Sequence, residues 1–463
     1  MSTFVNAGAR LDRLPISSFH RRIMLLIGIG MFFDGFDIYV AATVLGATLH
    51  SGFSTMGQNA LFVSATFVGM MLGSFLTGFL GDKYGRRFTY QFNLLLFGLA
   101  SLLAAFAPNM SVLIVLRLII GIGLGAENVV GYSTLTEFVP ARVRGKWQGG
   151  LAVFVVTGLP AAALVGSWII PIFTWRAMFV LGGIGALIVW YLRKSLPESP
   201  RWLESVGRDD EAEQLLRKIE AETVASTGAE LPAVPARSAA AQSFSLRSLI
   251  GPRLLPLMFV GCVALIVINT LLYGFITWLP TFFVKQGLTI ATSFQYAMLM
   301  AIGAPVGSAI GALTSDSWGR KPTIVIASAV AIVFGFIYPF VSDPVLLPVV
   351  GFALTVPIYV LVALLFGMYI PELFPTEVRL RASGICNTFG RGATIATPFI
   401  VVSLFTDYGI RGVLTLMIGL LALLIVVVLA FGVESGRRNL EEIVRKSDDG
   451  PAAATAGSIG GRA

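Results

Sequence analysis

The stretch Gly81-Asp-Lys-Tyr-Gly-Arg-Arg87 recurs 234 residues further along the chain as Ser315-Asp-Ser-Trp-Gly-Arg-Lys321. A second pair of matching stretches, Glu137-Phe-Val-Pro-Ala-Arg-Val-Arg144 and Glu372-Leu-Phe-Pro-Thr-Glu-Val-Arg379, is separated by 235 residues. If the first match had arisen by chance, the second pair would have no reason to be separated by almost the same number of residues. The two offsets therefore indicate a duplicated unit, with both copies in the same orientation.

The composition places this duplicated chain in a membrane. Of its 463 residues, 56% are hydrophobic and 13% are charged, whereas a soluble protein carries about 25% charged residues. Stretches such as 88–107 and 411–433 are almost free of charge. About 20 such residues cross a hydrocarbon core about 30 Å thick. We expect an all-α integral membrane protein with twelve spans in two six-helix bundles.

The apolar stretches divide the chain into five parts. The expected spans are 22–46, 57–80, 88–107, 111–136, 146–168, 175–194, 253–279, 293–314, 322–341, 346–371, 382–404 and 411–433. The parts are an N-terminus over 1–21, a bundle over 22–194, a linker over 195–252, a second bundle over 253–433 and a tail over 434–463. Because residues 1–21 are polar and basic and run into a full-length span, no cleavable signal peptide is expected.

Positive charge predicts the topology. The basic residues of the even-numbered connections are Lys83, Arg86, Arg87, Arg142, Arg144, Lys146, Arg320, Lys321, Arg379 and Arg381. The opposite connections hold little beyond Arg176, Lys285 and Arg411. Positive charge marks the cytoplasmic side, so we expect both termini in the cytoplasm and the protein in the inner membrane. This location of the basic residues explains the net charge of +8, so we expect no nucleic-acid partner.

The linker begins with a charged amphipathic stretch. Its apolar residues Trp202, Leu215, Leu216 and Ile219 could form one face of short helices that lie on the membrane surface. The Ala-, Ser- and Pro-rich stretch 223–245 is typical of a flexible tether.

The repeated stretches combine an acid, a glycine and basic residues in a tight turn. Glycine supplies the backbone freedom, and the acid can lie near a helix N-terminus or pair with arginines of a neighbouring loop. Such a group can hold helix ends together in one conformation and release them in another. A single copy would be read as a positive-inside turn; two copies in register favour a gate. The gate residues are Asp82, Gly85, Arg86, Arg87, Glu137, Arg144, Asp316, Gly319, Arg320, Glu372 and Arg379.

This arrangement resembles the major facilitator superfamily, whose signature lies between spans 2 and 3 and recurs between spans 8 and 9. Arg117-Leu-Ile-Ile-Gly-Ile-Gly-Leu-Gly125 and Pro197-Glu-Ser-Pro-Arg-Trp-Leu203 resemble sugar porters and organic-ion carriers. Asp34-Gly-Phe-Asp37 resembles the aromatic acid:proton symporters. The resemblance implies a monomer of two bundles that rock around a central small-molecule site by alternating access.

Five ionisable residues stand out inside the expected spans, away from the span ends: Asp34, Asp37, Arg117, Glu127 and Arg391. Such groups are costly in a bilayer and are functional candidates. At 1.5 Å per residue, Asp37 lies about 22 Å above the start of span 1 and Arg117 about 8 Å below the start of span 4. In a core about 30 Å thick these heights coincide, so the two can pair.

An aspartate that pairs with arginine in one state and loses it in another can bind and release a proton. In the proton-coupled sugar porters that the chain resembles, the matching aspartate and arginine have this role. The alternative for Asp37 and Arg117 is a static pair that joins spans 1 and 4. Glu127 could be a second proton site, a substrate contact or a partner for another polar group.

Arg391 lies near the middle of span 11. Its guanidinium can hold a substrate carboxylate by two parallel hydrogen bonds, or can pair with Glu127 or Asp34. The further candidates for substrate binding are Tyr39, Asn128, Gln148, Asn269, Tyr273, Tyr359 and Asn387. Each of these could equally be an interhelical hydrogen bond.

The expected function is proton-coupled uptake of a small organic anion such as an aromatic or sugar acid. The alternative is a proton-linked sugar or polyol symporter, although span 7 reads Asn269-Thr-Leu-Leu-Tyr273 where sugar porters carry paired glutamines. A membrane sensor that keeps the fold is a third class, disfavoured by the retained gates. No nucleotide-binding motif, catalytic triad or metal cluster is found in the sequence, so we expect no enzyme activity and no cofactor besides the proton.

Overall fold

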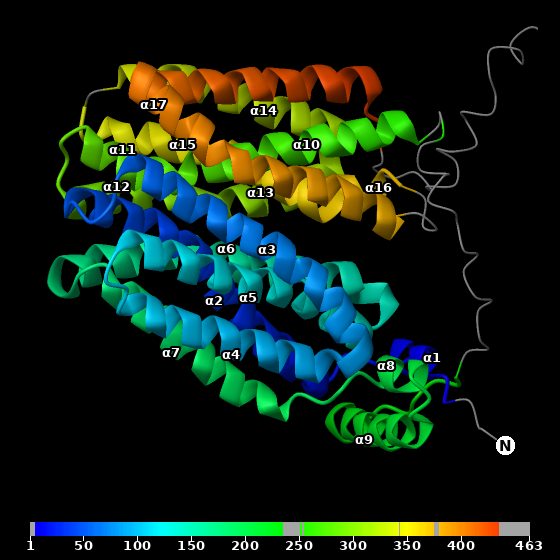
Figure 1. Ribbon diagram of the computed structural model, residues 1–463. Coiled ribbons are helices and arrows are strands. Elements are labelled where there is room, and N and C mark those ends of the chain that lie inside the picture. The colour runs from blue at the N-terminus through cyan, green and yellow to red at the C-terminus, as the bar shows by residue number, and fades with distance from the viewer. Residues whose placement is uncertain (1–4, 235–250, 252–253, 342, 375–378, 435–463) are drawn as a thin grey trace, which may run out of the picture. The chain divides into compact units, whose positions relative to one another are not determined.

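The computed structural model describes residues 5–234, 251, 254–341, 343–374 and 379–434, and this part of the chain is helical without strands (Figure 1). Eleven helices in it are long and apolar enough to cross a membrane. The last candidate, Ala382–Phe431, contains Gly409 at φ +64°, a non-helical conformation that divides helix α17 (Arg379–Phe431) into two segments. The all-helical membrane fold is confirmed, and the last two expected spans are the segments of α17.

The first compact unit comprises Met1–Ala239, Tyr273–Pro305 and Thr394–Ile410. Its long helices are α2 (Ser18–His50), α3 (Met56–Tyr84), α4 (Arg86–Ala105), α5 (Met110–Phe138), α6 (Arg144–Phe173) and α7 (Arg176–Leu192), with 3-10 turns η1 (Ala141–Val143) and η2 (Arg193–Ser195). Helix α3 packs on α5, and α2 packs on α6. A Cβ on Gly69 of α3 would lie 3.0 Å from the Cα of Gly121 on α5, so glycine permits this close approach.

Segments from the second copy of the sequence repeat also belong to this unit. Helix α11 (Leu279–Lys285), preceded by η4 (Ile276–Trp278), packs on α2, and α12 (Ile290–Ala301) packs on α6. The Ser64 hydroxyl of α3 donates to the Ile395 carbonyl of α17 at 2.8 Å. The first unit therefore includes the ends of second-copy helices that are predicted to face away from the cytoplasm.

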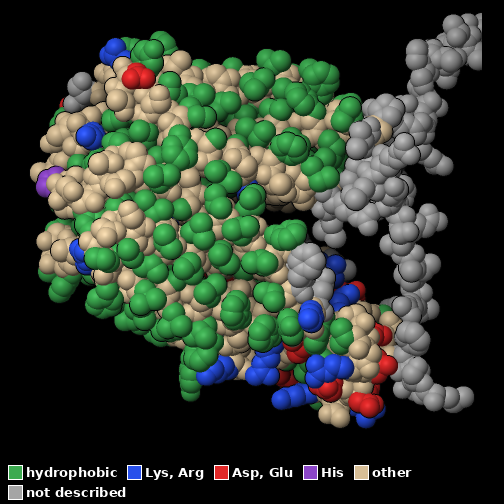
Figure 2. Space-filling model, in the orientation of Figure 1, with side chains coloured by type: hydrophobic (Ala, Val, Ile, Leu, Met, Phe, Trp, Pro, Cys, Tyr) green, Lys and Arg blue, Asp and Glu red, His purple; other side chains and the backbone are tan. Residues whose placement is uncertain are grey.

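Three short helices, α1 (Ala7–Asp12), α8 (Pro200–Ser205) and α9 (Asp209–Thr227), pack together at one end of this unit (Figure 1). Charged side chains gather over them, whereas the face over the long helices is mostly hydrophobic (Figure 2). Trp202, Leu216 and Ile219 are buried in one core with Leu11 of α1. The expectation that this face lies on the membrane surface is wrong, because the N-terminal segment and the helix ends cover it.

The second unit comprises Ala240–Leu272, Val306–Ala393 and Arg411–Ala463. It contains most of α10 (Leu255–Gly274) and α13 (Gly303–Trp318), together with α14 (Arg320–Ile337), α15 (Leu346–Leu364), α16 (Ile370–Glu372) and parts of α17. A 3-10 turn η5 (Tyr338–Phe340) and a π-helical turn η6 (Leu365–Tyr369) also belong to it. Helix α14 packs on α15. A π-turn inside a long helix often marks a functional position.

Candidate functional site

The turn between α3 and α4 consists of one residue, Gly85, at φ +91°. The Glu198 carboxylate accepts hydrogen bonds there from the backbone N–H groups of Arg86 at 2.9 Å and Arg87 at 3.2 Å. The Arg86 side chain pairs with Glu137 of α5 at 2.9 Å. A carboxylate is favoured at a helix N-terminus, where N–H groups lack partners. We call these five residues the first turn cluster.

The turn between α13 and α14 repeats this construction. Gly319 is the single connecting residue, at φ +94°. The Glu434 carboxylate accepts from the N–H groups of Arg320 at 2.8 Å and Lys321 at 2.9 Å. The Arg320 side chain pairs with Glu372 at 3.1 Å. We call these five residues the second turn cluster; each compact unit thus contains one.

Sequence reasoning missed Glu198 and Glu434 as members of the two turn clusters. They stand 236 residues apart (434 − 198) in the matching contexts Pro197-Glu-Ser199 and Val433-Glu-Ser435, so a third repeat signal was present. Burial raises the pKa of Glu198 above its usual range, and the N–H groups of Ser199, Arg87 and Arg86 oppose that rise.

The remaining gate candidates have different surroundings. Arg144 contacts Asp12 of α1 at 3.3 Å and the Val139 carbonyl at 3.4 Å, so it joins the N-terminal segment to the end of α5. Arg87 also donates from its side chain to the Lys194 carbonyl at 3.0 Å. The side chains of Asp82, Asp316 and Arg379 lie outside the part of the chain that the structure describes.

Inside the first unit, Asp37 of α2 and Arg117 of α5 form an ion pair, as their estimated heights allow. Arg117 Nη1 lies 2.5 Å from Asp37 Oδ2, and Nη2 donates to the Asp37 carbonyl at 2.9 Å. The Nε group donates to Thr66 of α3 at 3.0 Å, and the guanidinium lies 5.1 Å from the centre of the Phe62 ring. Both charges are fully buried, and these extra contacts offset part of the cost of removing them from water.

A second buried ion pair joins Glu127 of α5 to Arg193 at the end of α7. Arg193 also donates to the carbonyls of Leu26 at 3.0 Å and Ile27 at 2.9 Å on α2. Three roles were predicted for Glu127, and the structure shows the third: Glu127 is the partner of another polar group, Arg193. We call Asp34, Asp37, Arg117, Glu127 and Arg193 the membrane cluster.

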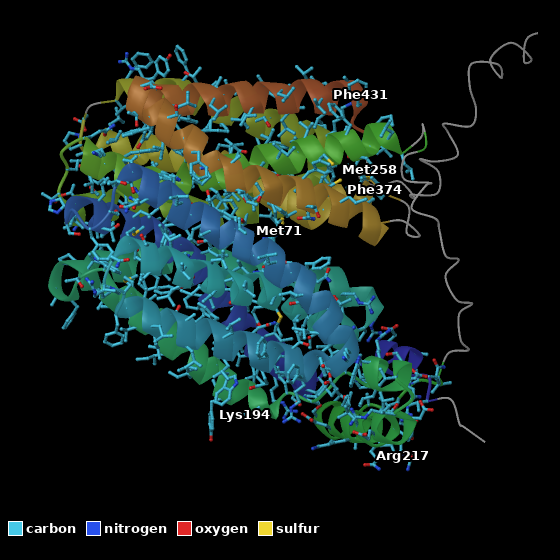
Figure 3. The ribbon with its side chains drawn as sticks, in the orientation of Figure 1. Met71, Lys194, Arg217, Met258, Phe374 and Phe431 are labelled. Atoms are coloured by element: carbon cyan, nitrogen blue, oxygen red, sulfur yellow. The ribbon has the colours of Figure 1, made fainter. Side chains whose placement is uncertain are left out.

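Arg193 was not singled out from the sequence, since a basic residue at the end of a span is usually an interfacial anchor. Its neighbour Lys194 is such an anchor: it points outward (Figure 3), with Nζ 4.0 Å from the centre of the Trp190 ring. Arg193 is 1% exposed and turns inward instead. No sequence signal separates these two adjacent residues.

Asp34 of α2 is fully buried, and neither of its carboxyl oxygens has a hydrogen-bond partner among the described residues. It lies within electrostatic range of Glu127, Arg193 and Asp37. Burying an ionised carboxylate without a partner is very costly. This arrangement therefore suits an Asp34 that carries a proton.

The predicted substrate-binding residues are divided between the two units. Asn128, Asn269 and Asn387 each donate from the side-chain amide to the carbonyl four residues earlier in their own helix, and Gln148 donates to Thr136 at 2.7 Å. The first unit contains Tyr39, Asn128, Gln148 and Tyr273; the second contains Asn269, Tyr359, Asn387 and the half-buried Arg391. The Tyr273 ring packs edge-on against Phe67, with centroids 4.4 Å apart.

The profile of the family described as "Sugar (and other) transporter" matches residues 23–446. The chain belongs to this family. It is accordingly a transporter of the major facilitator superfamily and not an enzyme, and its ion pairs are parts of a transport protein.

Relatives in this family cover almost the whole chain. The "Inner membrane metabolite transport protein YdjE" of Escherichia coli K12 is 38% identical over 453 residues, which cover 96% of this chain and 99% of the relative. The "Niacin transporter NiaP" of Acinetobacter baylyi is 30% identical over 444 residues, 94% of this chain and 99% of the relative. A partially occluded inward-open structure of the E. coli xylose transporter XylE has a TM-score of 0.70 at 17% identity, over 91% of this chain and 100% of XylE. That last likeness shows the fold.

Proposed function

We propose that this transporter couples the uptake of a small organic anion to the entry of protons. The observation that carries the proposal is the fully buried Asp37–Arg117 pair with the unpartnered Asp34 one helical turn away. A structural ion pair would need no third carboxyl group beside it. Ionisable groups at membrane depth are typical of proton relays in transporters.

The chain's own residues can exchange protons as follows. While Arg117 holds Asp37, its positive charge keeps that carboxylate ionised. A conformational change that withdraws Arg117 leaves Asp37 buried without its cation, so the carboxylate takes up a proton. The return of Arg117 expels the proton. Alternating access thereby links proton binding on one side of the membrane to release on the other.

An aromatic or sugar acid fits as substrate for two reasons. The relative NiaP is a niacin transporter by name, and niacin is a pyridine carboxylic acid. Arg391 offers a guanidinium inside a span of the second unit, where it can bind a carboxylate by two hydrogen bonds. We place the protein in the bacterial inner membrane, as the name of YdjE states for that relative, with both termini cytoplasmic and the monomer as the working form.

A proton-linked sugar or polyol symporter is the second candidate. It is favoured by a relative named "Arabinose-proton symporter" from Bacillus subtilis, 26% identical over 432 residues.

Uptake by proteoliposomes separates the candidates. Labelled nicotinate and benzoate should accumulate when the outside is acidic and should only equilibrate when the pH is equal on both sides. Hexoses and pentoses, at the same concentration, serve as the matched comparison. Accumulation of a sugar and not of the acids would overturn the anion proposal; accumulation independent of the pH gradient would overturn proton coupling.

A further inference from the structure

The membrane cluster links two ion pairs along antiparallel helices. Ile27 to Asp37 on α2 and Arg117 to Glu127 on α5 each span ten residues, about 15 Å along the helix. Arg117 binds α2 at the Asp37 level, and Arg193 binds α2 at the Ile27 level, where it also holds Glu127. Asp34 lies between the two pairs.

The charges of this cluster can be counted. The packed helices α3, α4, α6 and α7 have no Asp, Glu, Lys, Arg or His over 57–81, 88–105, 147–173 and 177–192. On α4, the Tyr90 ring lies against Arg193, 5.9 Å from its guanidinium. The cluster therefore holds three carboxyl groups against two guanidinium groups. It has a net charge of −1 when fully ionised and is neutral with one proton.

The environment of Arg193 is shaped to keep that guanidinium in place. A Cβ on Gly30 of α2 would overlap the guanidinium, so glycine leaves the space it needs. Its Nε and Nη2 groups are bound by the carbonyls of Leu26 and Ile27 and do not depend on Glu127. Arg193 can therefore remain buried when Glu127 is neutral.

Glu127 and Asp34 both have carboxyl oxygens without a hydrogen-bond partner among the described residues, so either can accept a proton. Glu127 uses Oε1 for Arg193, whereas its Oε2 has no hydrogen-bond partner among the described residues. Both Asp34 oxygens are also without one in that part of the chain. Two acids that interact in a dry site titrate as a pair and not as independent groups.

We propose that the membrane cluster binds one proton, which Asp34 and Glu127 share, and that Arg193 is the positioning residue for its release. This inference rests on the proposed proton coupling: the proton that Asp37 takes up while Arg117 is withdrawn is the one that passes to Asp34 and Glu127 when Arg117 returns. In this scheme the proton is first on Asp34, whose oxygens have no hydrogen-bond partner among the described residues, and Glu127 is ionised beside Arg193. Transfer of the proton to Glu127 Oε2 leaves Asp34 ionised and Glu127 neutral, with the total charge unchanged. Glu127 then loses its attraction to Arg193, which lies where α7 ends and the predicted cytoplasmic segment begins, and the proton leaves on that side.

The proposal is tested by measuring how many protons move with each substrate molecule, because the charge count predicts this number for each single variant. Proteoliposomes that contain a pH-sensitive dye report the protons, and labelled nicotinate reports the substrate. The wild type should move one proton. In Glu127→Gln and in Asp34→Asn the cluster has two carboxyl groups and two guanidinium groups. Because it is then neutral without a bound proton, each variant should move no proton. The double variant Glu127→Gln/Arg193→Gln has two carboxyl groups against one guanidinium group, so it can again bind a proton. It lacks both the shared acceptor and the residue that positions release, so it should move none.

The control is Glu213→Gln on α9, which removes a carboxylate outside the membrane and should leave the proton count at one. Retention of the proton by Glu127→Gln but not by Asp34→Asn would overturn the shared site. A double variant that moves one proton per substrate would overturn the roles of Glu127 and Arg193, because the proton would then leave without either of them. A wild type that moves no proton would instead contradict the proposed function.

Discussion

The two turn clusters are nearly the same, whereas the interiors of the two repeat copies differ. In each cluster a carboxylate, Glu198 or Glu434, accepts from two backbone N–H groups at the start of a helix after a glycine of positive φ. At an offset of 235, however, Arg117 and Glu127 correspond to Phe352 and Val362. The second copy has no acid–base pairs at the positions of the membrane cluster.

This difference indicates which parts of the protein carry which task. A feature kept in both copies suits a motion that both copies make, such as the predicted opening and closing of helix ends at the turn clusters. A feature present in one copy suits chemistry that happens once per cycle. We therefore infer that both copies gate the transporter and that the first copy alone binds the coupling proton.

The largest effect is expected for Asp37→Asn. The amide cannot take up a proton, so accumulation driven by a pH gradient should be abolished while exchange of labelled for unlabelled substrate persists. Uptake and counterflow in the same proteoliposomes measure both. The variant Asp37→Glu, which keeps the carboxyl group, should retain some accumulation. Unchanged accumulation in Asp37→Asn would contradict the inference that the first copy binds the coupling proton.

Arg391→Ala tests the cation of the second copy. If Arg391 binds a carboxylate, affinity for anions should fall by about 10- to 100-fold, the effect of losing a charge-assisted contact of about 1.5–3 kcal/mol. A neutral analogue, nicotinamide in place of nicotinate, should be unaffected. Equal losses for both compounds in a binding titration would assign Arg391 to structure instead.

A matched pair, Glu198→Gln and Glu434→Gln, tests whether the two turn clusters are equivalent. Gln keeps acceptor atoms but loses the charge that favours a helix N-terminus, so each variant should lower the transport rate by a similar factor, about tenfold at most. Gly57→Ala, at a position with open space around it, is the control. A large effect from one variant alone would show that one gate dominates.

The smallest effect concerns the N-terminal segment, which has no described counterpart in the second copy. Burial alone would raise the pKa of Glu220 on α9, but hydrogen bonds from Arg10 and Arg13 lower it overall. Because the pKa of Glu220 is lowered in the docked segment, the ionised carboxylate stabilises docking at pH values above its ordinary pKa, near 4.5. This stabilisation is lost as the pH falls through the lowered pKa. Limited proteolysis at residues 5–17 should therefore accelerate below about pH 4.5. In Glu220→Gln this pH dependence should be weaker.

Much of the site could be predicted from residue spacing along the sequence. The repeat offsets located both turns, and the rise of the α-helix set Asp37 and Arg117 at one height, where the structure pairs them. These predictions succeeded because membrane thickness and helix geometry constrain height strongly. Height says nothing about rotation around a helix end, and Arg193 and Lys194 occupy almost the same height with opposite orientations.

By itself, the sequence determined the membrane class, the duplicated six-span unit, the two glycine turns and the depth of the buried charges, because hydropathy, spacing and helical rise are properties of the chain alone. Only the tertiary structure decided the partner of Glu127, the inward turn of Arg193, the carboxylates at the two turns and the burial of the α8 and α9 faces. Each of these depends on which distant segment lies opposite, and side-chain pairing across a bundle is set by packing rather than by periodicity.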